Sequence, residues 1–198
     1  MNVNRSVEFF DTQFEKQVAA ADFALNPFEQ AALPYARGVV LDLGCGLGNL
    51  SVAAARRGAE VLAVDASRHA IDRIRETASA ECLNIRAELA DIASYEIAGE
   101  YDAVLCIGLL MFFPRPQAIA VLGRLQRAVM RGGVAVVNVL IEGTTYMGMF
   151  EPGSYCLFGR DELREKFDGW HILRSTHEGF DAPGGTRKEF STVIARKP

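Results

Sequence analysis

Short apolar runs alternate with amphipathic segments along most of the chain, and this alternation is the main guide to its fold. An apolar run without a polar side predicts a strand that is buried on both faces, as in a parallel sheet. Apolar residues at helical spacing predict the helices between the strands. The predicted strands cover residues 39–43, 60–65, 83–89, 101–107 and 134–141, and the predicted helices cover 50–57, 67–78 and 116–129, the last ending near Gly132–Gly133.

Strand–helix alternation of this kind predicts a doubly wound α/β fold with helices on both faces of a parallel sheet. The last part of the chain has a different pattern, with a short helix at 161–167 and strands at 171–175 and 189–195. Two strands with little helix between them predict an antiparallel pair at the edge of the sheet.

The first 35 residues predict amphipathic helices that lie over the sheet. Five phenylalanines recur there at helix-like intervals, at positions 9, 10, 14, 23 and 28. We expect most of these rings to pack in the core and one or two to cover a ligand site.

Composition is that of an ordinary globular protein, with 198 residues, 49% hydrophobic and 23% charged. The net charge of −4 provides no overall attraction for nucleic acid or for an anionic membrane. No apolar run is long enough to span a bilayer, and the charged, aromatic start does not resemble a secretory signal. We therefore expect a cytoplasmic protein whose partner is a small molecule, not nucleic acid or membrane.

The four cysteines, at positions 45, 82, 106 and 156, form no CxxC pair, and no histidine stands near one at zinc-site spacing. They are expected to be free thiols in a reducing compartment. No metal site is predicted, because the three histidines are scattered along the chain.

A glycine-rich loop at residues 42–49, DLGCGLGN, directly follows the first strand and precedes a helix. Its glycines permit a tight turn and a close approach of ligand to backbone. Asn49 stands where the dinucleotide fingerprint needs its third glycine, and no Lys-Ser/Thr follows as in a P-loop. Asp42 places a carboxylate under the loop, which suits an ammonium or sulfonium group better than a pyrophosphate. The loop therefore favours a cationic nucleoside over NAD.

Two further carboxylates follow the next two strands. Asp65 ends its strand, where an acidic side chain can accept hydrogen bonds from a ribose diol. Asp91 is placed to accept from an adenine amino group while Ile92 packs on the ring. The structural alternatives are a charge at a helix N-terminus for Asp65 and an exposed turn residue for Asp91.

The successive motifs VVLDLGCGLGN, EVLAVDAS, the Asp91 step, YDAVLCIGLLMFF and MRGGVAVVNVL resemble, in order and spacing, those of class I S-adenosylmethionine-dependent methyltransferases over about residues 35–141. A weaker resemblance to the tellurite-resistance, TehB-like group extends over nearly the whole chain, through residues 106–113, 160–164, 169–170 and 192–197.

This resemblance implies a Rossmann-like, seven-stranded sheet, mostly parallel with the last strand antiparallel. It implies a methyltransferase domain at residues 36–198 and a helical cap at 1–35 that covers the site as part of one compact unit. It also implies S-adenosylmethionine as cofactor, S-adenosylhomocysteine as product, and a cofactor site formed by Asp42, Gly44, Cys45, Gly46, Gly48, Asn49, Asp65, Ala66, Asp91, Ile92, Cys106 and Ile107. Cys106 and Ile107 would lie near the reactive methyl group.

The expected substrate-binding stretch departs from the TehB-like pattern, which has a His-Arg pair and a further Arg before the last strand. Residues 177–188 contain no such pair, which argues against a tellurium oxyanion as acceptor. Either Arg187 or Lys188 is expected to supply one positive charge, with His177 nearby. The candidate catalytic residues are His177, Tyr146 and Arg187, where the two first named are candidate bases.

A sulfonium methyl group is already electrophilic, so its transfer mainly needs an aligned acceptor and the exclusion of water. The apolar segment 108–113 and the residues Met147, Met149, Phe150, Tyr155 and Phe158 predict a small apolar pocket. We expect transfer to a small acceptor, which is a thiol, a selenium or tellurium species, or a small natural product. The alternatives are a non-catalytic S-adenosylmethionine-binding module and an NAD-linked oxidoreductase. A monomer or homodimer is expected.

Overall fold

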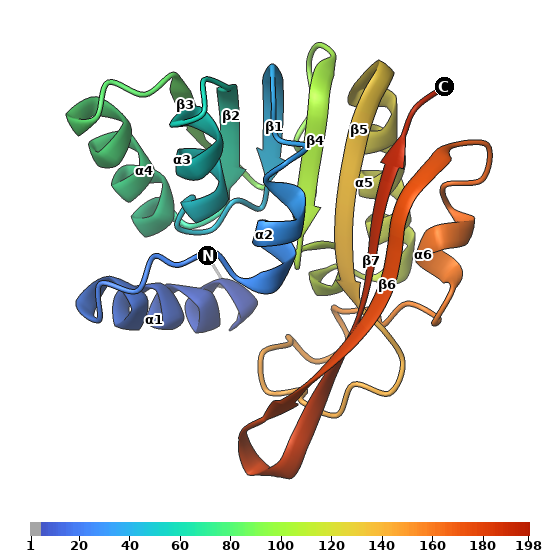
Figure 1. Cartoon of the computed structure of the whole chain (residues 1–198). Coiled ribbons are helices and arrows are strands. Elements are labelled where there is room, and N and C mark those ends of the chain that lie inside the picture. The colour runs from blue at the N-terminus through green and yellow to red at the C-terminus, as the bar shows by residue number, and fades with distance from the viewer. Residues whose placement is uncertain (1–4) are drawn as a thin grey trace.

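Seven strands lie side by side in the order β3-β2-β1-β4-β5-β7-β6 in the structure, a computed structural model that describes residues 5–198 (Figure 1). The strands are β1 (Val39–Leu43), β2 (Glu60–Asp65), β3 (Ile85–Leu89), β4 (Tyr101–Ile107), β5 (Val129–Leu140), β6 (His171–Ala182) and β7 (Thr186–Arg196). The first five are parallel, whereas β7 runs antiparallel to both β5 and β6. The predicted sheet with a reversed last strand is confirmed.

Helices cover both faces of the sheet, and α1 lies across its carboxyl edge (Figure 1). They are α1 (Arg5–Ala19), α2 (Pro27–Ala32), α3 (Asn49–Ala55), α4 (Arg68–Ala80), α5 (Arg115–Ala128) and α6 (Glu162–Glu165), with short 3-10 turns η1 (Leu110–Phe112) and η2 (Pro183–Gly185). The cap predicted over residues 1–35 contains two of these helices, and its residues 1–4 lie outside the described part of the chain. Within residues 5–198 no helix is long and apolar enough to cross a lipid bilayer.

Local caps explain where two of the helices begin. Ser67 Oγ accepts a hydrogen bond from Ala70 N at the start of α4, as its position before the apolar repeat predicts. Asn26 and Glu29 form a capping box at the start of α2: the Asn26 side chain accepts from Glu29 N, and the Glu29 side chain accepts from Asn26 N.

The core consists of one apolar layer on each face of the sheet. Leu41 and Leu43 of β1 belong to the buried cluster that includes the apolar side of α5. Val40, which directly precedes Leu41 and points to the other face, belongs to the opposite cluster with α3 and α4. Because side chains alternate along a strand, a strand with two covered faces needs a continuous apolar run, which is the pattern seen in the sequence.

The structure corrects two of the predicted boundaries. Residues 129–133 are strand and not the end of a helix, because Val129 already has an extended backbone and pairs with Tyr101. Backbone bonds between Gly132–Gly133 and Lys197 hold this segment beside the chain's last strand. The second boundary is that of the final hairpin, where β6 and β7 are longer than predicted and extend beyond the rest of the sheet (Figure 1).

Candidate active site

A cavity of about 680 Å³ lies at the carboxyl edge of the sheet, where β1 separates β2 from β4. Its walls come from the loop after β1, the ends of β2 and β5, η1 and the β6–β7 hairpin, and α1 and α2 complete it. An open α/β sheet binds its ligands at this edge and at this change of strand order.

The glycine loop forms the floor of the cavity beside β2. Gly44, Gly46 and Gly48 all have positive φ, at 75°, 51° and 74°. A Cβ on Gly46 would stand 3.2 Å from the Phe14 ring of α1, and one on Gly48 would stand 2.5 Å from Ile74 of α4. Gly46 therefore allows α1 to lie close to the loop, whereas Gly48 allows α3 and α4 to pack together.

Asp42 is buried under this loop. Its side chain is only 4% exposed and accepts a 2.6 Å hydrogen bond from Ser51 Oγ of α3. Burial raises the pKa of Asp42 to about 7, although the Ser51 bond acts in the opposite direction. A cation in the cavity would stabilise the ionised form.

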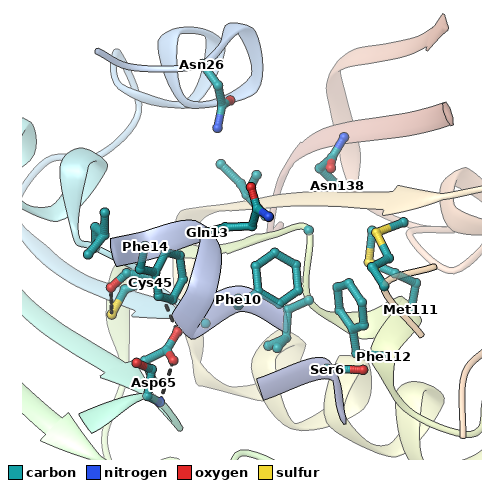
Figure 2. A pocket seen from close by; sticks show the side chains of 18 of the residues that line it. Ser6, Phe10, Gln13, Phe14, Asn26, Cys45, Asp65, Met111, Phe112 and Asn138 are labelled. Carbon is teal, nitrogen blue, oxygen red and sulfur yellow. Dashed lines mark hydrogen bonds between the residues drawn. The ribbon is translucent and has the colours of Figure 1, made fainter. Parts of the chain in front are cut away.

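Asp65 at the end of β2 is fixed by two backbone donors. Its Oδ2 accepts from Gly46 N at 2.9 Å, and its Oδ1 accepts from Ser67 N at 2.8 Å (Figure 2). Burial raises the pKa of Asp65, and these backbone bonds partly offset that shift. Each carboxylate oxygen has a further lone pair, so the oriented carboxylate can accept two more hydrogen bonds from a ligand.

Helix α1 forms a roof over the cavity. The lining residues of α1 recur every three or four positions, as one face of a helix does, and are Ser6, Phe9, Phe10, Gln13, Phe14 and Gln17. Phe10 packs edge-on against Phe112 of η1 with ring centroids 5.1 Å apart (Figure 2). Ser67 Oγ donates to Asp11 Oδ1, which joins α1 to the start of α4.

The wall opposite Asp65 comes from β5 and the final hairpin. It combines apolar side chains with Asn138, Tyr146 and Lys188. Lys188 is half-buried, and its Nζ lies 4.6 Å from the centre of the Tyr146 ring. Burial lowers the pKa of Lys188.

Two buried oxygens that border the cavity have no hydrogen-bond partner within the described residues. They are Asn49 Oδ1 at the start of α3 and Asn138 Oδ1 on β5. A buried acceptor without a partner is costly, so each marks a place where a ligand can donate a hydrogen bond. Residues 5–198 contain no group of three or more His, Cys, Asp or Glu side chains that could hold a metal ion.

Most of the predicted site residues lie around this one cavity. Those that line it are Asp42, Gly44, Cys45, Gly46, Asn49, Asp65, Ala66, Asp91, Ile92, Ile107 and Tyr146. Asp91 also caps its own turn, since its carboxylate accepts from Ala93 N and Ser94 Oγ. Four of the five predicted phenylalanines line the cavity too, and the fifth, Phe23, is exposed beneath Arg73.

Four of the predicted residues, Gly48, Cys106, His177 and Arg187, do not line the cavity. Strand alternation accounts for Cys106 and Arg187, whose chain neighbours Ile107 and Lys188 do line it. Cys106 is buried on the opposite face of the sheet, in the cluster that includes α5. His177 Nε2 lies 2.7 Å from Arg160 O, away from the cavity, and Arg187 pairs with Asp181 and Glu189 on the hairpin. His177 and Arg187 therefore do not line the cavity. Lys188, one position further along β7, faces the cavity instead.

Asn138 lines the cavity but is not among the site residues that the sequence motifs predict. The available signal was a single amide side chain within the apolar run 134–141. A polar residue inside a buried strand needs a partner, which is a structural or a ligand group.

Comparison with known proteins gives a consistent result. Residues 40–133 match a family described as a methyltransferase domain. Over 164 residues the chain is 29% identical to the probable S-adenosyl-L-methionine-dependent methyltransferase TehB of Haemophilus influenzae (strain 10810), an alignment that covers 80% of this chain and 57% of that protein. The chain thus spans little more than half the length of this curated relative.

Two solved structures share the fold. TehB from Haemophilus influenzae has a TM-score of 0.75 and 24% identity, over 88% of this chain and 63% of that chain. The 1,6-didemethyltoxoflavin-N1-methyltransferase of Burkholderia thailandensis, with bound 1,6-didemethyltoxoflavin and S-adenosylhomocysteine, has a TM-score of 0.71 and 19% identity, over 97% and 86%.

Proposed function

Because this chain belongs to the class I S-adenosylmethionine-dependent methyltransferases of the TehB-like type, we propose that it transfers a methyl group from S-adenosylmethionine to a small-molecule acceptor. The observation that carries the proposal is the convergence of the glycine loop, Asp42 and Asp65 on one cavity at the carboxyl edge of the sheet. The cavity volume of about 680 Å³ is within the range of small-molecule and cofactor sites.

The residues around the loop fit this cofactor. Asp65 is oriented by Gly46 N and Ser67 N, and its remaining lone pairs would accept the ribose hydroxyls. Asp42 and the unpartnered Asn49 Oδ1 would accept from the ammonium group. Asp91 and Ile92, at the end of β3, would bind the adenine.

The cofactor supplies, when bound, a methyl group on a positively charged sulfur. The chain itself would align the acceptor with the methyl group and exclude water, because these two effects chiefly accelerate an in-line displacement. Phe10 and Phe112 close the roof above the cavity. Ile107 and Asn138 form the wall next to the end of β4, where the acceptor would meet the methyl group.

The residues at the acceptor end do not require a catalytic triad. Tyr146 and Lys188 are the titratable side chains that we propose for this end, since both line the cavity and contact each other. Burial lowers the pKa of Lys188, which favours its neutral form more than in water. An acceptor that carries a proton can lose it to water. A thiol, a selenium or tellurium species, or a small natural product remains our proposal for the acceptor class.

Calorimetry with S-adenosylhomocysteine tests the proposal directly. We expect binding at micromolar concentration, and the absence of binding at millimolar concentration would overturn the proposal. NADH should not compete, because Asp42 would stand beside its pyrophosphate. The alternative is a non-catalytic binding module, which the missing His-Arg pair would also fit. Release of S-adenosylhomocysteine from S-adenosylmethionine with any member of an acceptor panel would exclude that alternative.

A further inference from the structure

The side chain of Asn138 carries an unused hydrogen-bond acceptor at the cavity wall. Asn138 is fully buried, and its Nδ2 donates to Thr192 Oγ1 of β7 at 2.9 Å. This bond fixes the amide plane and leaves Oδ1 without a partner in the described structure. The oxygen borders the cavity, across from Asp65 (Figure 2). A ligand atom with an attached hydrogen would satisfy it.

Asn138 also lies at the place where transfer would occur. In the sheet it pairs with Ile107, the last residue of β4, and its carbonyl accepts from Gly108 N. In the proposed function, this end of β4 is where the acceptor would meet the methyl group. A donor held on Asn138 Oδ1 would therefore be close to the atom that receives the methyl.

Lys188 provides a positive charge at the other end of the same wall. It is four residues before Thr192 on β7, on the same face of the strand, so their Cα atoms are about 14 Å apart. No ion pair joins Lys188 to a carboxylate among the described residues, and its Nζ lies 4.6 Å from the centre of the Tyr146 ring. A half-buried ammonium beside an aromatic ring is a site for an anionic group.

Apolar and aromatic side chains fill the distance between these two polar groups. Leu140 and Phe190 continue the rows of Asn138 and Thr192 toward Lys188, and Phe10, Met111 and Phe112 lie across from them. Flat rings pack well against such walls.

We propose that Asn138 and Lys188 form the acceptor subsite, and that the acceptor is a small aromatic acid. Its anionic group binds Lys188, and its O–H or N–H donates to Asn138 Oδ1. This inference rests on the proposed function and adds to it the class of substrate. The acceptor heteroatom forms a bond to the methyl carbon with its lone pair, displaces the sulfur with the electrons of the broken carbon–sulfur bond, and loses its own proton to water.

The test uses the full chain saturated with S-adenosylhomocysteine, and calorimetry with hydroxy- and aminobenzoates and the corresponding cinnamates. Each acid is compared with its methyl ester, which lacks the charge, and with its O- or N-methylated counterpart, in which the donor is lost or hindered. We expect at least one acid to bind ten-fold or more tightly than its ester and than that counterpart. If S-adenosylhomocysteine binds and no acid shows this ten-fold preference, the inference is wrong while the proposed function stands.

Variants with matched controls assign the two ends. Lys188→Met should abolish the preference for acid over ester, whereas Arg187→Met, its neighbour on the opposite face, should keep it. Asn138→Leu should weaken binding of the acid at least ten-fold. Thr176→Val removes a buried, unpartnered hydroxyl group outside the cavity and should not weaken it. Unchanged S-adenosylhomocysteine binding shows that each variant is folded. Acid preference that survives Lys188→Met, or acid affinity that survives Asn138→Leu, would overturn the assignment.

Discussion

The buried carboxyl group of Asp42 makes stability and cofactor affinity respond to pH in opposite directions. Its pKa in the folded protein is about 7, against an ordinary value near 3.8. Between these values the folded state binds more protons than the unfolded state, so the stability from this group is complete below the lower pKa and is lost as the pH rises through 7. A bound cation needs the ionised form, which the rising pH supplies.

Asp42→Asn is expected to remove this dependence, because an amide does not titrate. The variant should be more stable than the native protein at pH 8, by roughly 1–3 kcal/mol, and the difference should shrink toward pH 5. Urea unfolding at a series of pH values measures it. The variant should also bind S-adenosylmethionine more weakly at pH 8, and parallel pH profiles for the two proteins would contradict the assignment.

Asp65 is the second residue whose charge is expected to bind the cofactor. Asp65→Ala should weaken S-adenosylhomocysteine binding by about 1–3 kcal/mol, because the ribose hydroxyls lose an oriented acceptor. Calorimetry measures the loss. Asp72 is an exposed carboxylate on α4 that pairs with Arg75, so Asp72→Asn is the control and should bind normally. Equal affinities of the two variants would remove Asp65 from the site.

At the scale of elements, α1 can pack against the glycine loop only because residue 46 has no side chain. Gly46→Ala is expected to weaken cofactor binding at least ten-fold, since the new Cβ would meet the Phe14 ring at 3.2 Å and φ is positive. Gly58 also has a positive φ, at 92°, but open space around it, so Gly58→Ala should lower stability by about 1 kcal/mol and leave binding intact. Equal effects on binding would show that backbone conformation, and not the α1 contact, matters at Gly46.

The local sequence predicts the bounds of a strand correctly where the strand is a single apolar run between polar residues. The strands at 39–43, 60–65 and 101–107 agree with the structure because each is a bounded apolar run. Segment 129–133 was misassigned as helix, since its strand character comes from pairing with Tyr101 and Lys197, both distant in sequence.

The site shows the same division. Asp42 near the end of β1 and Asp65 at the end of β2 follow from motif and spacing, because neighbours in the chain set their positions. Arg187 and Lys188 are adjacent, and only the pairing of β7 decides which of them faces the cavity. The sequence pattern therefore predicts the cofactor end better than the acceptor end.

At the scale of the whole molecule, ligand binding should stabilise the fold as one unit. S-adenosylhomocysteine at 100 times its Kd is expected to add about 2.7 kcal/mol, because it binds the folded state alone. For a domain of this size that corresponds to a rise in Tm of about 5–10 °C in a thermal scan. NADH at equal concentration serves as the control and should cause no rise. A scan unchanged by S-adenosylhomocysteine would contradict the cofactor assignment.

The position of β7 has a consequence for how the protein folds. β7 lies between β5 and β6, although β6 precedes it in the chain, and in the sheet β6 pairs with β7 alone. Until residues 186–196 insert, β6 has no strand to join, and β5 presents an open hydrogen-bonding edge. We therefore expect refolding yield to fall as protein concentration rises, because intermediates that await this insertion can associate through exposed strand edges.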